Sequence, residues 1–242
     1  MGEPPIRLFK TTTLADQVYE YLLRQISTGA YRPSSPLREL DLVAQFGVSR
    51  TPIREALLRL AESGLVEMNG RSARVRRLEE HDVVHIYQVR RALEVEAARL
   101  AWGRYTDADF AELEELVPKD HEESGVSGFE AACYELDGKL HRLVAERSGN
   151  PLLAQELRKL HDLVQLVHRP MADRGQMVLE LHQHVQILAA LKAGDRKAYG
   201  RALHQHLRSA CQAQVSCVRA LANGLAPDAA NGEHSAAASW GS

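Results

Sequence analysis

Four residues in the second half of the chain have the side chains and the spacing of a metal site. Asp137 and His141 lie four residues apart, so on a helix their side chains meet on one face. His184 and His206 both have apolar residues as their helical neighbours, so both are expected to point into a helical core. One carboxylate and three imidazoles are a suitable ligand set for a divalent transition metal. These residues therefore form a candidate metal centre.

Spacing alone leaves a second interpretation of these histidines open. A single inward histidine is more often a hydrogen-bonded core residue than a metal ligand. His161 falls near the same apolar face and carries the same ambiguity, with a structural role favoured. His182 and His204 are rotated by about 200° from His184 and His206, which places them on outer or flanking faces. Position on the helix thus separates candidate ligands from surface histidines.

The elements that must position these residues are all helices. From about residue 80 to residue 221, apolar residues recur at helical spacing, and short breaks containing Gly or Pro separate the segments. Six or more helices with short links predict an antiparallel all-α bundle. The Ala-, Ser- and Gly-rich segment from residue 223 to residue 242 lacks apolar periodicity and is expected to be a disordered tail.

The first part of the chain has a different pattern, in which three helices precede a β-hairpin. Thr13 and Asp16 form a capping-box pattern at the start of the first helix. In the short second helix Leu40 is expected to face inward, Gly47 then permits a tight turn, and Ser49 is a suitable N-cap for the third helix. The predicted elements are a helix from residue 13, helices at 38–46 and from 50, and strands at 65–68 and 73–77 around Asn69-Gly70.

This order predicts a mainly α protein in which a winged helix-turn-helix precedes the bundle. The outward face of the third helix presents Ser49, Arg50, Thr51 and Arg54, and the N-terminal end of this helix enters the DNA major groove in such motifs. Residues 1–78 carry 12 Lys and Arg against 8 Asp and Glu, whereas the remainder carries 18 against 24. A basic head on an acidic body suits a protein whose head binds DNA. The expected domains are an arm at 1–10, the winged helix-turn-helix at 11–78, the bundle at 79–222 and the tail at 223–242.

Composition excludes several other classes of protein. The chain has 242 residues, of which 45% are hydrophobic and 26% are charged, as in proteins that bury a core. No run of 18 apolar residues and no secretory leader is present, so we expect a cytoplasmic protein without a membrane partner. The three cysteines lack metal-type spacing and are expected to be reduced thiols.

The first domain resembles the GntR family of bacterial regulators. The resemblance rests on Pro36-Leu-Arg-Glu-Leu, Gly47-Val-Ser-Arg-Thr-Pro-Ile-Arg-Glu-Ala-Leu and Gly64-Leu-Val. It implies that Arg38, Arg50, Thr51 and Arg54 contact operator DNA and that Ser49 contacts a phosphate. Ser72 stands where the family usually has a wing glycine; Gly70 is the candidate for that role, and Arg71 or Arg74 for a phosphate contact.

The second domain resembles the FCD ligand-binding domain of the FadR-type GntR subfamily. The segments that carry this resemblance are Arg90-Arg-Ala-Leu-Glu94, Asp137-Gly-Lys-Leu-His141, Gly149-Asn150 and the region from His184 to His206. It implies that Asp137, His141, His184 and His206 hold a divalent ion, with zinc favoured over nickel, manganese or iron. It also implies a homodimer that binds a small carboxylic acid effector. Arg90 matches a family arginine, which suggests a contact with the effector carboxylate or a salt bridge.

Together these features predict a ligand-responsive transcriptional regulator, with repression favoured. One alternative makes the metal ion itself the signal. A second alternative, a metal-dependent enzyme, is disfavoured because no further Glu or His is clearly placed as a general base.

Overall fold

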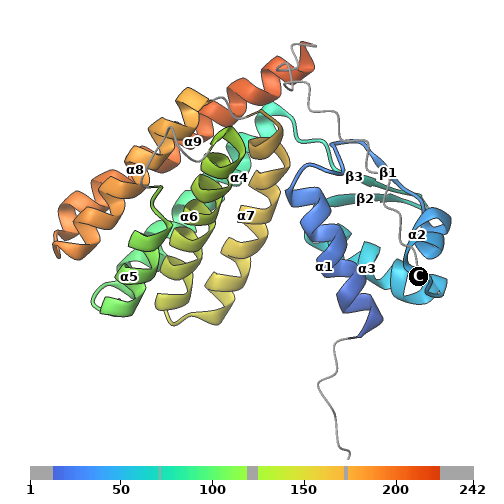
Figure 1. Ribbon diagram of the computed structural model, residues 1–242, viewed down its shortest axis with the longest axis horizontal. Helices are drawn as coiled ribbons and strands as arrows, with labels where there is room; N and C mark the ends of the chain where they lie inside the picture. Colours follow the sequence, from blue (N-terminus) through green and yellow to red (C-terminus); the bar gives the residue numbers. More distant parts are fainter. Residues whose placement is uncertain (1–12, 71, 119–124, 172–173, 224–242) are drawn as a thin grey trace, which may run out of the picture.

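The structure is a computed structural model that describes residues 13–70, 72–118, 125–171 and 174–223. A small mixed head stands at one end and a helical bundle forms the rest (Figure 1). The expected arm, Arg71 and almost all of the expected tail lie outside the described residues. The elements are α1 (Leu14–Ser27), β1 (Pro36–Leu37), α2 (Glu39–Phe46), α3 (Arg50–Glu62), β2 (Val66–Asn69), β3 (Ser72–Val75), α4 (Glu80–Ala101), α5 (Asp107–Leu116), α6 (Gly125–Arg147), α7 (Pro151–Met171), α8 (Arg174–Lys192) and α9 (Arg196–Ala222).

The head packs three helices against a three-stranded sheet. The sheet order is β1-β3-β2 and both pairings are antiparallel. Leu22 from α1 and Ile53 and Leu57 from α3 are fully buried at the centre of its core. Thr13 and Asp16 form the capping box predicted for the start of α1. The hairpin was predicted, but β1 was not among the predicted strands, because two residues are too few to show an alternating pattern.

One expectation about the head was wrong. Leu40 was expected to face inward, yet it is 62% exposed, and Leu42 is the buried residue of α2. The helix begins at Glu39, so Leu40 lies in its first turn on the outer side and Leu42 faces the core. Gly47 closes α2 with φ 63°, a left-handed conformation that glycine adopts without steric cost and that turns the chain into α3.

The second part is the predicted antiparallel helical bundle. Helix α4 packs against α9, α6 and α7, and α8 packs along α9 (Figure 1). The side chains of Phe129, Leu136, Leu140 and Met177 are almost fully buried between these helices. Tight turns such as Gly149-Asn150 and Gly194-Asp195 connect them, and Asp195 caps α9 by accepting hydrogen bonds from two backbone amides. None of the described helices is long and apolar enough to span a lipid bilayer.

The head contacts the bundle through α1, which packs against α7. Leu163 of α7 lies close to Gly64, at the end of α3. Arg76, just after the wing, forms an ion pair of 2.8 Å with Asp82 in the first turn of α4. Only the short segment 76–79 separates β3 from α4, so the wing is joined almost directly to a bundle helix.

Candidate metal centre and DNA-reading face

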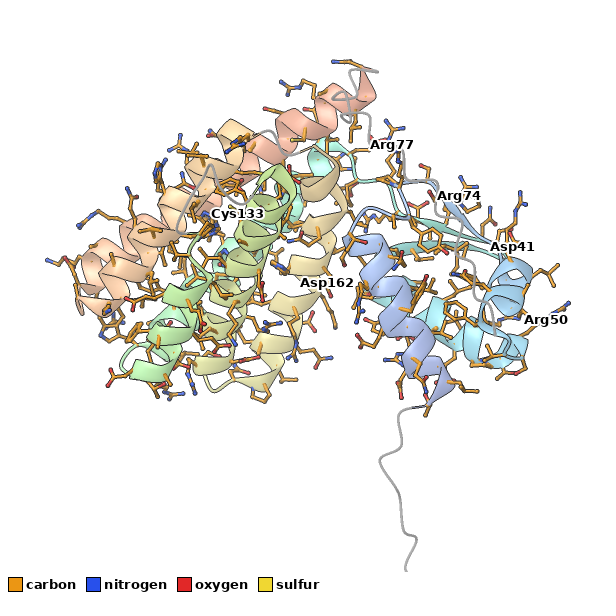
Figure 2. All side chains as sticks on the ribbon, viewed as in Figure 1. Asp41, Arg50, Arg74, Arg77, Cys133 and Asp162 are labelled. Carbon is orange, nitrogen blue, oxygen red and sulfur yellow. The ribbon has the colours of Figure 1, made fainter. Side chains whose placement is uncertain are left out.

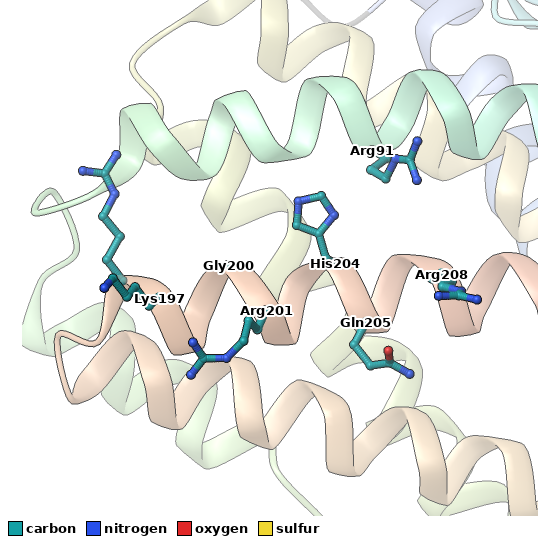
Figure 3. Close-up of a pocket in the computed structure, with 8 residues that line it drawn as sticks. Arg91, Lys197, Gly200, Arg201, His204, Gln205 and Arg208 are labelled. Atoms are coloured by element: carbon teal, nitrogen blue, oxygen red, sulfur yellow. The ribbon is translucent and has the colours of Figure 1, made fainter.

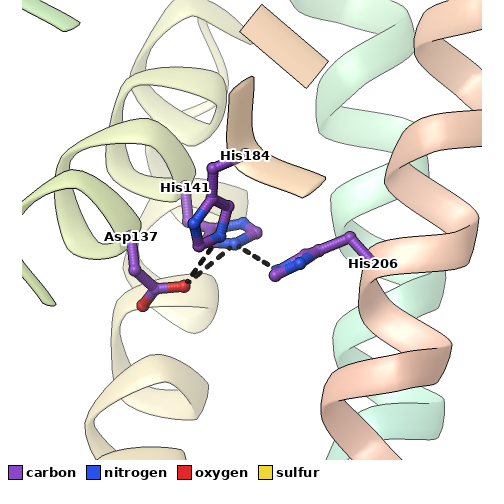
Figure 4. A group of neighbouring side chains, drawn as sticks. All are labelled: Asp137, His141, His184 and His206. Carbon is purple, nitrogen blue, oxygen red and sulfur yellow. Dashed lines mark hydrogen bonds and ion pairs between the residues drawn. The ribbon is translucent and has the colours of Figure 1, made fainter. Parts of the chain in front are cut away.

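Three helices bring the four predicted ligands together in the bundle interior (Figure 4). Asp137 and His141 project from successive turns of α6, His184 comes from α8 and His206 from α9. Asp137 Oδ1 lies 3.4 Å from His141 Nε2 and 3.2 Å from His184 Nε2. One donor atom from each of the four residues lies within 4.8 Å of the other three. The three imidazoles are buried, and Asp137 is mostly so.

Two further residues fix how two of these imidazoles are oriented. Glu94 Oε2 accepts a hydrogen bond from His141 Nδ1 at 2.8 Å, and Gln183 Oε1 accepts one from His206 Nδ1 at 3.2 Å. Because each Nδ1 carries the donated proton, both Nε2 atoms are the ones available to a cation, and they face each other at 3.1 Å. The sequence prediction did not include Glu94 and Gln183 in the site. Both residues adjoin predicted site residues in the sequence, since Glu94 ends the segment Arg90-Arg-Ala-Leu-Glu94 and Gln183 precedes His184.

The protonation states follow from this geometry. Burial acts to lower the pKa of His141, but Glu94 outweighs it and raises that pKa to about 9. Burial and the neighbouring His184 and His141 hold the pKa of His206 well below its usual range. Burial opposes ionisation of Asp137, yet the adjacent imidazoles of His141 and His184 hold its pKa well below 3.8. A hydrogen bond between the two facing Nε2 atoms needs a proton on one of them, and a divalent cation bound there would replace it.

The donor set fits such a cation. His184 Nε2 is buried and makes no hydrogen bond, although it lies beside Asp137. Nitrogen and carboxylate donors around a dry centre suit zinc and related divalent metals.

Arg90 lies beside this centre and is buried, with 3% exposure. Its Nε atom forms a close ion pair with Glu94 Oε1, so the salt bridge considered for Arg90 is present. Its Nη1 lies 3.5 Å from the Tyr87 hydroxyl, and its Nη2 has no hydrogen-bond partner. A buried guanidinium donor without a partner is energetically costly. The guanidinium therefore has one donor left for a ligand.

His161 of α7 also borders the site but lies further out. Its Nδ1 is 4.0 Å from Asp137 Oδ2 and makes no hydrogen bond, while its Nε2 lies 3.2 Å from Gln165 Nε2. Burial lowers the pKa of His161 to about 4, so the ring is neutral. This geometry matches a neighbour of the metal ligands better than a fifth ligand.

The free space beside the site is very small. A cavity lined by Cys133, Glu180, Asp137 and His184 has a volume of about 10 Å³. That volume is close to the minimum for one water molecule. A small organic acid therefore needs side-chain or helix movement before it can reach the centre.

The predicted DNA-reading residues lie on the exposed surface of the head. Arg50, Thr51 and Arg54 are exposed in the first turns of α3, and Ser49 is its N-cap residue. The Ser49 hydroxyl makes no capping hydrogen bond, which leaves it available to a phosphate.

A groove on the head brings three arginines from separate elements together. Arg38 precedes α2, Arg50 begins α3 and Arg74 lies on β3, and all three line a groove of about 790 Å³. Figure 2 labels Arg50 and Arg74 on the head. Ser72 lines it as well, whereas Gly70, with φ 62°, lies at the hairpin turn. Arg71, the other candidate for a phosphate contact, lies outside the described residues. Arg74 thus joins the DNA-reading candidates by position.

Comparison with known proteins matches both parts of the chain to described families. Residues 14–75 match the family described as bacterial regulatory proteins, gntR family, and residues 85–209 match the FCD domain. The HTH-type transcriptional repressor RspR of Escherichia coli (strain K12) is 30% identical over 84% of this chain and 89% of its own length. The probable D-xylose utilization operon transcriptional repressor of Paenarthrobacter nicotinovorans is 32% identical over 81% of this chain and 86% of its own.

Solved structures agree with these matches. E. coli McbR/YncC superposes with a TM-score of 0.74 at 25% identity, covering 85% of this chain and 99% of that structure. A putative transcriptional regulator GntR from Rhodococcus sp. RHA1 superposes with a TM-score of 0.71 at 25% identity, covering 84% and 97%.

Proposed function

Because the chain belongs to the GntR family of bacterial regulatory proteins and carries an FCD domain, it is a DNA-binding transcriptional regulator, and we propose that it is a repressor controlled by a small organic acid. The family consists of transcription regulators and not of enzymes. In this proposal the acid binds in the bundle beside a divalent metal ion, for which zinc is favoured and nickel, manganese and iron are alternatives. Two copies form a homodimer that holds a pair of α3 helices on operator half-sites.

The convergence of Asp137, His141, His184 and His206 supports the metal part of this proposal. Glu94 and Gln183 accept hydrogen bonds from the Nδ1 atoms of two of these histidines, so the two Nε2 atoms are left to face one point, where a cation would replace the shared proton. A bound divalent ion would supply an electrophile to which a carboxylate oxygen can bind.

Arg90 supports the proposed class of effector. Its partnerless Nη2 donor suits a carboxylate, which accepts charge-assisted hydrogen bonds from guanidinium groups. The Arg90–Glu94 ion pair keeps the guanidinium in place before an effector arrives. An organic acid would therefore bind between Arg90 and the metal ligands, which requires helices or side chains to move there, because Arg90 does not line the small cavity.

The helix movement that admits the effector would also couple effector binding to DNA binding. Helix α4 carries Arg90 and Glu94, and only four residues join it to the wing. A shift of α4 would change the separation of the two α3 helices and the population of DNA-competent dimers.

A thermal-shift screen of small mono- and dicarboxylic acids tests the effector. An acid that binds the native state raises the unfolding midpoint, and a chelator or His184→Ala should remove that increase. Stabilisation that survives both changes would place the acid away from the metal centre. If a divalent metal raises the unfolding midpoint and no acid does, the metal ion itself is the regulatory signal.

A separate experiment tests the DNA-reading face. Duplexes selected by the parent protein from a random pool should not be bound specifically by Arg50→Ala/Arg54→Ala. Arg142→Ala, an exposed change on α6, is the control and should bind like the parent. An unchanged footprint from the double variant would remove these residues from the reading face.

A further inference from the structure

A second, strongly basic groove lies on the outer side of the bundle, where α4 runs beside α9 (Figure 3). Its volume is about 820 Å³, which is within the size range of small-molecule sites. Arg91 lines it from α4, and the other lining residues lie in the first half of α9. Its basic side chains are Arg91, Arg196, Lys197, Arg201, His204 and Arg208.

This concentration of positive charge is uncompensated by the protein. Within the described part of the chain, no carboxylate pairs with Arg91, Lys197, Arg201 or Arg208, and none lines the groove. The guanidinium of Arg196 lies over the ring of Trp102, 5.9 Å from the ring centroid. The surrounding domain has more acidic than basic residues, so the cluster does not reflect a basic surface in general. Like charges held this close repel one another until an anion neutralises them.

A glycine forms part of the floor of the groove. Gly200 lies in the interior of α9, where glycine is unfavourable relative to alanine. Packing does not require it, because a Cβ atom built there meets nothing within 4 Å. Its effect is to leave a depression on the helix surface, with Lys197 one turn before it and His204 one turn after it. A ligand can therefore approach the helix backbone between cationic side chains.

We propose that this groove is a binding site for a small molecule with more than one phosphate group. Arginine forks bind phosphate oxygens in pairs, and lysine adds a compact charge. Cations one helical turn apart along α9 lie roughly 6 Å apart, so they can contact separate phosphate groups of one ligand. One phosphate would sit over Gly200, and a second would lie between Arg201, Arg208 and Arg91.

The position of the groove argues for a separate ligand and against operator DNA. Its residues lie on the opposite face of α9 from His206, whereas Arg50 lies on the head at the other end of the molecule (Figure 2). His204 and Arg208 are each two residues from His206 on α9, so occupation of the groove can alter the α9 position at the metal centre.

Titration calorimetry of the full-length protein with fructose 1,6-bisphosphate tests the proposal, with fructose as the phosphate-free comparison. At about 0.15 M ionic strength we expect saturable binding of one bisphosphate per chain and none of fructose. Arg201→Glu should weaken binding by about tenfold or more. Arg142→Glu, the same charge change at an exposed site on α6, should leave binding unchanged.

Gly200→Leu keeps the charge and fills the depression, so it should also weaken binding. Because leucine favours helix more than glycine, its unfolding midpoint should not fall, which separates a blocked site from a misfolded chain. Binding must persist in His184→Ala; its loss there would place the bisphosphate at the metal centre and overturn the proposal.

Three other results would also overturn it. One is the absence of saturable bisphosphate binding by the parent protein. Another is a changed molar mass of Arg201→Glu in light scattering, which would make the groove a contact between copies. The third concerns non-operator DNA. If such DNA binds the Arg50→Ala/Arg54→Ala variant but does not bind the triple variant that also carries Arg201→Glu, the groove is a nucleic-acid site.

Discussion

At the scale of single residues, the candidate metal centre depends on side chains that differ only in which way they point. His182 and His184 lie two residues apart on α8, but His182 is exposed and His184 is 3% exposed. We expect His184→Ala to purify with less divalent metal than the parent and His182→Ala to keep the parent amount. Elemental analysis of the purified proteins measures this directly. Equal metal in all three proteins would exclude His184 as a ligand.

Gln183 permits a sharper experiment, because it touches a proposed ligand without being one. Gln183→Leu removes the acceptor for His206 Nδ1 and changes neither charge nor bulk greatly. The loss of such an orienting partner should lower metal affinity by about 10–100-fold. Gln186→Leu, an exposed change on the same helix, is the matched control. Competition with a metal-binding dye provides the affinities, and identical values for the two variants would show that Gln183 does not orient the site.

The sequence could predict which residues approach one another, but not how their protons are arranged. Asp137 and His141 are four residues apart, so their meeting is a property of any helix. Glu94 lies 47 residues from His141, and only the packing of α4 against α6 brings them to 2.8 Å. The buried guanidinium of Arg90 follows from the same packing. Long-range polar contacts of this kind leave no periodic signal in a chain.

At the scale of elements, two helices that begin after a hydroxyl-bearing N-cap residue behave differently, because Asp16 follows Thr13 by three residues whereas Pro52, which has no N–H to donate, follows Ser49. The Thr13 side chain accepts a hydrogen bond from the Asp16 amide, while Ser49 at the start of α3 makes no such bond. We therefore expect Thr13→Ala to lower the free energy of unfolding by about 1 kcal/mol and to leave DNA binding near the parent value.

Ser49→Ala should have the opposite profile, with little change in unfolding and weaker DNA binding. Chemical denaturation and anisotropy with a labelled operator duplex provide both values for each variant. A loss of about 1 kcal/mol in Ser49→Ala with unchanged DNA affinity would make Ser49 an ordinary helix cap.

Helix periodicity and turn residues were sufficient to predict the helices and the hairpin of this fold. They were insufficient where an element is too short to have a period. Strand β1 has two residues. In α2 the expected inward face included Leu40 together with Val43 and Phe46; the latter two pack against the core, but Leu40 is exposed and Leu42 is buried. The grouping of Arg74 with Arg38 and Arg50 required the pairing of β1 with β3, in which Pro36 lies opposite Arg74.

At the scale of the whole molecule, the contact between head and bundle contains a half-buried carboxyl. Asp162 lies on the side of α7 near Tyr19 and Glu20 of α1 (Figure 2). Burial, with a smaller effect of Glu20, raises its pKa from 3.8 to about 6. The folded state therefore holds this proton more tightly than the unfolded state does. The stability that this bound proton contributes is complete below pH 3.8 and is lost as pH rises through about 6.

Asp162→Asn should remove this pH dependence, because asparagine stays neutral. We expect the stability of the variant to increase relative to that of the parent as pH rises, by up to about 3 kcal/mol at pH 8. Denaturant unfolding at several pH values measures the difference. Glu146→Gln, an exposed change on α6, is the control. A difference between Asp162→Asn and the parent that does not vary with pH would contradict the assigned cause.

The burial of the four proposed ligands has a consequence for time as well as for affinity. They come from three helices, and the adjoining cavity holds about one water molecule, so an ion could exchange only when the helices separate. Exchange of a bound ion would then be as slow as that opening, and an acid that needs movement of the same helices would reach the centre no faster than they open. The rate at which these helices separate would therefore limit how quickly the protein responds to a change in the concentration of the acid.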